Sequence, residues 1–236
     1  MSVSVVSQAP HPAVWRAAQA GPPPTRVLAT GHPELAAHLP GRGWPYHCLI
    51  ELLTPRPGRG EAALLQPALA QVAGSAPILL VQPPHPPCAQ GWLAPWPADA
   101  RLWWLQPATP ADTLWALNQA VRSGACAAVL AWLPDVTELA LRRLQLAAQA
   151  APTLLIVVRP WACRQQSSPA PLRLGLLPGT AGGLEIHFLK MRGGRPAQPI
   201  VVAGERGIAS RPVPSSPEAV PSPLAALAGG GPGVLE

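Results

Sequence analysis

Short apolar runs alternate with segments of helical periodicity over most of the sequence. Each run is closed by a turn rich in Pro or Gly, and its continuous hydrophobicity is typical of a strand that is buried on both faces of a parallel sheet. The predicted strands span residues 46–53, 77–81, 101–106, 126–133 and 152–158. The pattern therefore predicts a sheet whose strands are separated by other elements.

Three segments between these runs place apolar residues at helical spacing: 61–72, 109–124 and 135–151. The second has the best-defined ends, because Thr109 can cap it, Pro110 suits its first position and Gly124 suits its end. Asp135 begins the third segment three residues before a glutamate, the spacing of a capping box. Pro67 lies inside the first segment, where it predicts a kink or an early break.

The alternation of strands and helices predicts an α/β fold, with a mostly parallel sheet flanked by helices. The pattern changes after Arg159. Residues 171–178 and 184–194 have the character of two strands with no helix between them. We therefore expect antiparallel strands to be added to the sheet near the C-terminus.

Composition divides the 236-residue chain into three parts. Residues 1–24 end with the sequence GPPP, which interrupts regular structure. We expect them to form an N-terminal arm that docks through Trp15. Residues 25–202 hold the predicted α/β core. Residues 203–236 are dominated by Pro, Ser, Gly and Ala, so we predict a disordered tail.

Charge and cysteine content narrow the function classes. The net charge of +6, from 17 basic and 11 acidic residues, favours a polyanionic partner, which can be nucleic acid or an acidic protein. The cysteines form no C-x-x-C pair, so we predict buried thiols rather than a zinc ribbon or a redox dithiol at Cys48, Cys88, Cys126 and Cys163. The sequence contains neither an apolar run of about 18 residues nor a signal peptide, so we expect a cytoplasmic protein without membrane contact.

The stretch ELLTPRPGRGEAALL, residues 51–65, has the layout of a phosphate-binding loop: an apolar strand, a turn and a helix. Such a loop needs glycines whose amides cradle phosphates, a lysine for the outer phosphates and a hydroxyl for Mg²⁺. Gly58 and Gly60 are present, but Glu61 and Ala62 follow them. We predict a degenerate loop. The plainer interpretation is an ordinary turn in which Glu61 favours the helix dipole.

The other parts of an ATPase are also missing from the pattern. A magnesium-positioning Asp belongs at the end of a buried strand, but residues 126–133 offer Trp132 near that place. The six histidines are scattered, without the spacing of a metal site or a catalytic triad. We therefore predict no catalytic residue, no cofactor and no metal site.

Several motifs together resemble the ImuA family of translesion-synthesis accessory proteins, which are related to SulA and RecA. The similar stretches cover about residues 13–202 and read VWRA, TGHPELAAHLPGRGWPYHCLIELLTPRPGRGEAALLQPALAQVA, AVRSGACAAVLAWL, LRRLQLAAQAAPTLLIVVRP and LEIHFLKMRGG. The most specific parts are TGHPELAAHLPGRGWP, the PGRGE turn and the KMRGG strand end. The resemblance implies a RecA-like fold in which residues 51–65 replace the phosphate loop and Trp132 stands near the lost magnesium-directing Asp.

The same resemblance implies a non-enzymatic accessory role in SOS-induced mutagenesis. The implied partners are an ImuB-type polymerase homologue and an error-prone replicative-type polymerase, and RecA is a further candidate. The first alternative is a SulA-like inhibitor of cell division that acts on the tubulin-like division GTPase. The second is an atypical ATPase, which Glu61, Ala62 and Trp132 argue against.

Basic residues late in the chain follow predicted strands, where the DNA-facing loops of such folds occur. The candidate contacts to DNA or a partner are Arg159, Arg164, Arg173, Lys190, Arg192 and Arg195. Ordinary solubilising charge is an equal alternative. Trp161 lies in a polar loop between two of these arginines and suits either stacking on a base or anchoring the loop. Tryptophans in apolar elements are more often core or interface residues, and this group comprises Trp103, Trp104, Trp115 and Trp132.

Overall fold

The computed structural model describes residues 26–58, 60–87, 96–179, 182–194 and 196–203. Its main sheet is built from β3 (Leu49–Thr54), β4 (Ile78–Val81), β5 (Leu102–Leu105), β6 (Ala128–Trp132), β7 (Leu154–Pro160), β8 (Leu172–Pro178), β9 (Leu184–Lys190) and β10 (Ile200–Val202). The strand order is β10-β9-β8-β3-β7-β6-β4-β5. The arm predicted at 1–24, with Trp15, and the tail predicted at 203–236, apart from its first residue, lie outside the described residues.

The six strands β5, β4, β6, β7, β3 and β8, in their order across the sheet, are parallel to one another. β9 and β10 are antiparallel additions at the β8 edge. The predicted α/β fold with a mostly parallel sheet is therefore confirmed. β8 runs parallel to β3, because the segment after β7 returns the chain across the sheet before β8 begins. That return contains a short 3-10 helix, η2 (Trp161–Gln165). The antiparallel addition itself consists of β9 and β10.

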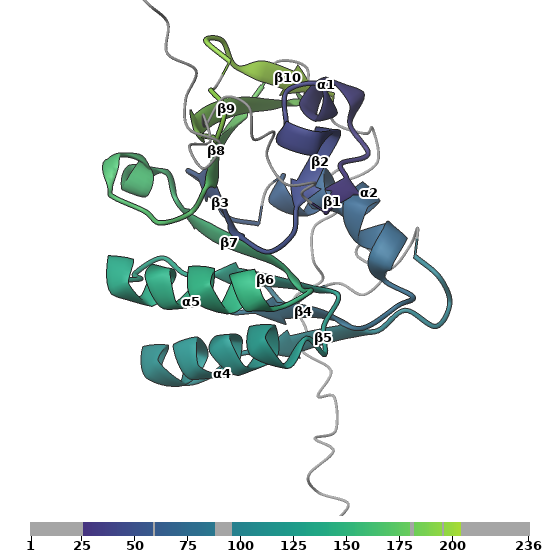
Figure 1. Cartoon of the computed structure of the whole chain (residues 1–236), viewed down its shortest axis with the longest axis vertical. Helices are drawn as coiled ribbons and strands as arrows, with labels where there is room; N and C mark the ends of the chain where they lie inside the picture. The colour runs from purple at the N-terminus through teal and green to yellow at the C-terminus, as the bar shows by residue number, and fades with distance from the viewer. Residues whose placement is uncertain (1–25, 59, 88–95, 180–181, 195, 204–236) are drawn as a thin grey trace, which may run out of the picture. The chain divides into compact units, whose positions relative to one another are not determined.

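Helices cover both faces of the sheet: α1 (Pro33–Ala36), α2 (Glu61–Val72), α4 (Pro110–Ser123) and α5 (Glu138–Ala150). Adjacent side chains of a strand point to opposite faces, so Ile50 joins the core under α2 while Leu49 joins the core under α4 and α5. Leu117 and Leu144 supply the helical side of the second core. Figure 1 shows α4 and α5 lying side by side on that face.

A small second sheet precedes the main one. It pairs β1 (Val27–Ala29) antiparallel with β2 (Gly43–Pro45). The segment of chain that connects these two strands contains α1 and the 3-10 helix η1 (Pro40–Arg42). Trp44 is fully buried in the core that α2 shares. A side chain at Gly43 would lie 2.5 Å from the carbonyl oxygen of Leu28, so the close approach of the two strands requires glycine there.

The helix ends test the predicted signals directly. Thr109 accepts a hydrogen bond from the Asp112 N–H at 3.1 Å, and Gly124 ends α4 with φ of 63°, so both predictions for this helix are confirmed. The cap predicted at Asp135 is wrong. Thr137 directly precedes α5 and accepts from the Ala140 N–H at 3.2 Å, because its hydroxyl is at the position from which the first turn can be reached.

Pro67 does not break α2, which continues to Val72. Its ring packs closely on Gly31, where an added Cβ would lie 2.2 Å from the Pro67 Cβ. Gln71 donates hydrogen bonds to the Pro67 carbonyl at 2.9 Å and to the Ala29 carbonyl at 3.1 Å. Tertiary packing therefore keeps the helix continuous. None of the helices within the described ranges combines the length and the apolar character that a membrane crossing requires.

Candidate functional site

The turn that resembles a phosphate loop connects β3 to α2. Gly58 has φ of 85° and Gly60, which caps α2, has φ of 110°. Both values lie in the left-handed region that favours glycine, since a Cβ is strained there. The glycines predicted for a phosphate loop therefore do shape the turn, and the expected arrangement of strand, turn and helix is present.

Glu61, the first residue of α2, folds its side chain back into this turn. The Gly58 N–H donates a hydrogen bond to Glu61 Oε1, and the indole N–H of Trp132 donates to the same oxygen at 2.9 Å. The Glu61 side chain is fully buried. Its other oxygen, Oε2, has no hydrogen-bond partner within the described part of the chain. A carboxylate from the chain itself therefore occupies the N-terminal end of α2.

The hydrogen bond joins Glu61 and Trp132, the two residues that the sequence analysis placed where a phosphate-binding group and a metal-directing group are missing. Glu61 begins the helix after β3, and Trp132 ends β6, which is separated from β3 by β7 in the sheet. A phosphate at the turn would meet the negative charge of the carboxylate, and Ala62 has no hydroxyl for a metal. The geometry thus favours a closed turn over a nucleotide site.

Two other segments lie directly against the turn. A Cβ added at Gly58 would lie 3.0 Å from His85 Cδ2 and 3.1 Å from Pro84 Cγ, in the loop after β4. A Cβ added at Gly60 would lie 2.6 Å from Leu184 Cδ1, at the start of β9. The turn is therefore packed against residues from both halves of the sheet.

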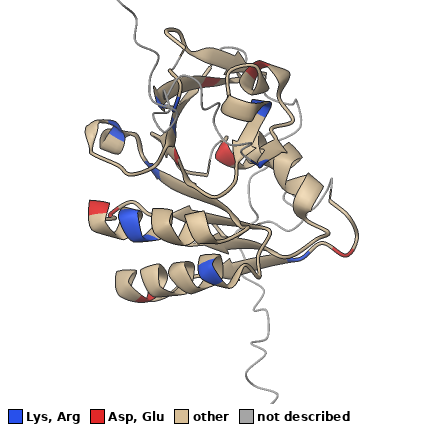
Figure 2. Cartoon of the chain, in the orientation of Figure 1, with Lys and Arg blue, Asp and Glu red and all other residues tan. Residues whose placement is uncertain are grey.

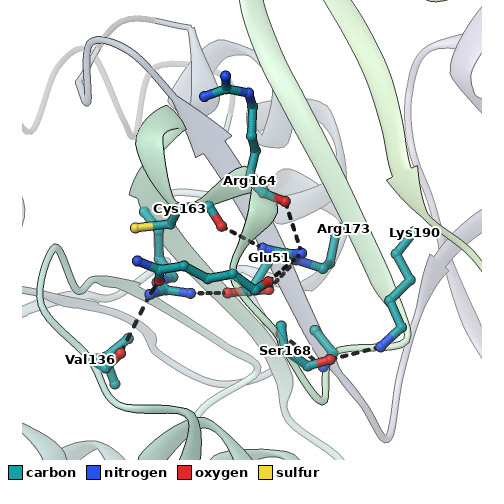
Figure 3. A network of polar contacts seen from close by, with 10 residues as sticks. Glu51, Val136, Cys163, Arg164, Ser168, Arg173 and Lys190 are labelled. Atoms are coloured by element: carbon teal, nitrogen blue, oxygen red, sulfur yellow. Dashed lines mark hydrogen bonds and ion pairs between the residues drawn. The ribbon is translucent and has the colours of Figure 1, made fainter.

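A second polar cluster lies on the central strands and centres on Glu51 of β3, which is fully buried (Figure 3). Arg159 of β7 donates to Glu51 Oε1 at 2.9 Å, and Arg173 of β8 donates to Glu51 Oε2 at 2.6 Å. Both arginines are also buried, with 2% and 6% of their surface exposed. Burial of charged groups is tolerated here because each carboxylate oxygen has a cationic partner.

The two arginines also hold η2 and the residues after it. Arg173 donates to the backbone carbonyls of Cys163 at 3.1 Å, Arg164 at 3.3 Å and Gln166 at 3.1 Å. Arg159 donates to the side-chain oxygen of Gln166 at 2.9 Å. The prediction that Arg159 and Arg173 contact DNA or a partner is therefore wrong for this fold, because both guanidinium groups are buried and donate to partners within the chain.

Trp161 anchors η2 on the sheet. An added Cβ at Gly175 would lie 2.2 Å from Trp161 Cζ3, so the indole packs directly on that glycine. The His187 ring meets the indole edge-on, with 5.9 Å between ring centroids. The Arg164 guanidinium lies 5.3 Å from the indole centroid, and Arg164 is exposed. Trp161 is thus a half-buried loop anchor, and Arg164 is the part of the pair that faces solvent.

The other basic residues that the sequence predicted as contacts to DNA or a partner do not form one cluster with Arg164 in the described part of the chain. Lys190 is exposed at the end of β9 and donates to the Ser168 carbonyl at 2.7 Å, as Figure 3 shows. Arg192 is exposed in the turn that follows, and Arg195 lies outside the described residues. Lys and Arg residues are spread over several elements in the view of Figure 2. Arg164, Lys190 and Arg192 are therefore the described residues from the predicted set that can reach a polyanion.

The cysteines of the described ranges behave as core residues. Cys48, Cys126 and Cys163 are free and buried, as predicted, and Cys88 lies outside those ranges. Burial raises the pKa of the Cys48 thiol to about 11, although the nearby charge of Arg192 acts in the opposite direction. Within the same ranges, no group of three or more His, Cys, Asp or Glu side chains is arranged to hold a metal ion.

Sequence inspection did not single out Glu51, although a signal for it exists. A glutamate inside the apolar run YHCLIELL must find a partner when the strand is buried. Its partners, 108 and 122 residues away, follow only from the sheet order. Comparison with protein-family models finds no matching model, and comparison with curated proteins finds no matching sequence. The resemblance to the ImuA family therefore rests on the sequence motifs quoted above.

Proposed function

We propose that this chain is a non-enzymatic accessory protein of SOS-induced translesion DNA synthesis. In this role it bridges an ImuB-type polymerase homologue and an error-prone replicative-type polymerase to RecA or the replisome. The pathway is inferred from the resemblance to the ImuA family. The observation that carries the non-enzymatic part is the hydrogen bonding of Glu61 to Gly58 and Trp132 inside the degenerate phosphate loop.

Nucleotide binding at this loop would have to displace the Glu61 carboxylate. Displacement would leave the buried indole N–H of Trp132 without its acceptor, which costs on the order of 1–3 kcal/mol. The incoming phosphates would gain no lysine and no metal-binding hydroxyl from Glu61 and Ala62. The loop therefore does not favour a cycle driven by nucleotide hydrolysis. In the proposed role, the protein acts by binding its partners at the same time.

The exposed guanidinium of Arg164 is the best candidate contact for DNA phosphate or for an acidic partner surface. Buried Arg173 fixes η2 by donating to the backbone carbonyls of Cys163 and Arg164, and the Trp161 ring lies against the Arg164 guanidinium. A guanidinium that is held in place loses less side-chain entropy when it binds an oxyanion. This supports η2 as a binding element in the proposed bridging role.

The test is a pull-down of the purified chain with RecA and with the ImuB-type homologue, with and without single-stranded DNA, at two salt concentrations. We expect capture of a partner in the absence of DNA. Arg164→Glu should weaken a contact made by η2 about tenfold or more, because it reverses the charge. Arg122→Glu is the matched control, since Arg122 is exposed in the last turn of α4.

Capture of neither partner, combined with salt-sensitive binding of DNA alone, would make the bridging role wrong and leave a DNA-binding protein. Nucleotide hydrolysis by the unaltered protein would contradict the non-enzymatic part. A third outcome would replace the pathway: a block of cell division on expression, with binding to the tubulin-like GTPase, would support the SulA-like alternative.

A further inference from the structure

β5 is the last strand of the main sheet, and no strand of the described residues pairs with its outer edge. On its inner side, the Ile78 N–H donates to the Arg101 carbonyl and the Gln82 N–H donates to the Leu105 carbonyl, both at 2.9 Å. Backbone groups in a parallel pair alternate in direction along the strand. The N–H and C=O groups of Leu102 and Trp104 therefore point to the open edge.

The side chains at this edge are apolar and exposed on both faces of the sheet. The exposed fractions are 48% for Trp103, 43% for Trp104 and 39% for Leu105. Trp103 pairs with Leu79, which belongs to the core under α4 and α5, so it projects on that face. Trp104 pairs with Leu80 of the other core and projects on the α2 face.

Edge strands of monomeric proteins are usually protected by charge, by proline or by a covering element. β5 has the sequence LWWL, with neither charge nor proline within it. Strand addition to such an edge would provide partners for its free backbone groups and would also bury its tryptophans. The edge therefore has the features of a pairing surface.

We propose that the β5 edge pairs antiparallel with β5 of a second copy of this chain, about a two-fold axis that is perpendicular to the sheet and passes midway between the two Trp103 residues. In this register Leu102 lies opposite Trp104 of the second copy, and Trp104 lies opposite Leu102. These pairs exchange the outward backbone hydrogen bonds. Trp103 lies opposite its own copy in a non-hydrogen-bonded pair, with Cα atoms about 4.5 Å apart.

A second copy is the occupant that the strand itself specifies. The outward residues Leu102 and Trp104 are apolar and uncharged, so antiparallel pairing with a second copy sets apolar side chains opposite each other and opposes no like charges. The exposed parts of Trp103, Trp104 and Leu105 amount to roughly 300 Å² per copy, given that an aromatic side chain buries up to about 250 Å². This is more than a third of the ~800 Å² that each partner buries in a standard interface.

The first experiment is sedimentation analysis of the full chain over a range of concentrations. We expect a monomer–dimer equilibrium. Trp104→Pro should raise the dimer dissociation constant about tenfold or more, because proline removes an N–H that points away from β4. Trp103→Lys should act similarly by placing two cations opposite each other across the axis. Trp115→Lys is the matched control, because Trp115 is 67% exposed on α4, outside the edge.

A wild-type protein that remains monomeric up to about 100 µM, a concentration far above the dissociation constants of specific dimers, would overturn the proposal. So would a dimer that Trp103→Lys leaves unchanged. Cross-linking gives an independent measurement that does not depend on the fold of the proline variant. Trp103→Cys should form an intermolecular disulfide under mild oxidation, since a Cα separation of about 4.5 Å permits one. Equal cross-linking of Trp115→Cys, or none for Trp103→Cys, would contradict the proposed register.

Discussion

The indole N–H of Trp132 donates a 2.9 Å hydrogen bond to Oε1 of Glu61, which also accepts from the Gly58 N–H. The residue that begins α2 is thus hydrogen-bonded to the residue that ends β6. In a working phosphate-binding loop, a lysine and a hydroxyl at the exit of the turn serve the phosphates and the metal. Here Glu61 and Trp132 form a buried polar contact that closes the turn.

Removing the acceptor of this contact should destabilise the protein. In Glu61→Ala the buried Trp132 and Gly58 donors lose their shared partner, and we expect the free energy of unfolding to fall by about 2–3 kcal/mol, measured by urea denaturation. Trp132→Phe should cost less, and the double variant should cost less than the sum, because the two residues share one interaction. Additive losses would show that the contact contributes nothing. Glu61→Lys should not create nucleotide hydrolysis.

Glu51 should be more important for stability than any exposed carboxylate. In Glu51→Gln the buried guanidinium groups of Arg159 and Arg173 lose their counter-charge, and we expect a loss of about 3–5 kcal/mol in the free energy of unfolding. The control is Glu138→Gln, which removes an exposed pair with Arg142 on α5 and should change stability little. Equal effects of the two variants would contradict a structural role for the buried cluster.

The contact between Gly175 and Trp161 predicts a strong pairwise coupling. Gly175→Ala places a methyl group 2.2 Å from Trp161 Cζ3, which is a severe overlap, so we expect a loss of about 1–3 kcal/mol and displacement of η2. The same change in a Trp161→Ala background should be tolerated. Gly74→Ala is a control, because the nearest atom to its added Cβ is 3.6 Å away. A coupling energy near zero in this double-mutant cycle would exclude the packing described.

The Cys48 thiol should stay protonated and unreactive in the folded protein. Burial raises its pKa from the ordinary value of 9.0 to about 11. Because the folded pKa is the higher one, the unfolded chain loses its thiol proton first as the pH rises. The contribution of Cys48 to stability is therefore complete below pH 9 and is lost between about pH 9 and pH 11. Cys48→Ala should show a shallower fall of the unfolding free energy over this interval, and thiol titration should show slow labelling until the protein unfolds.

Much of the core was predictable because local signals agreed with the fold. Apolar runs closed by prolines and glycines located β3 through β9, and Thr109 and Gly124 defined α4 through their own backbone preferences. The short elements between residues 27 and 45 were not predicted, since strands of three residues such as β1 and β2 have too little periodicity to detect. The cap at Thr137 was missed because Asp135 offers an equally good local pattern.

The sequence by itself determined the α/β class, the glycine-dependent turn after β3 and the absence of a lysine and a hydroxyl at its exit, because these depend on residue type and near-neighbour spacing. Only the tertiary structure decided the partners of the charged and aromatic residues. Arg159 and Arg173 face inward because β3 lies between β7 and β8, where Glu51 meets both. Trp103 remains exposed because β5 is an edge strand. Strand order is a long-range property, set by the packing of the whole sheet, and no local spacing encodes it.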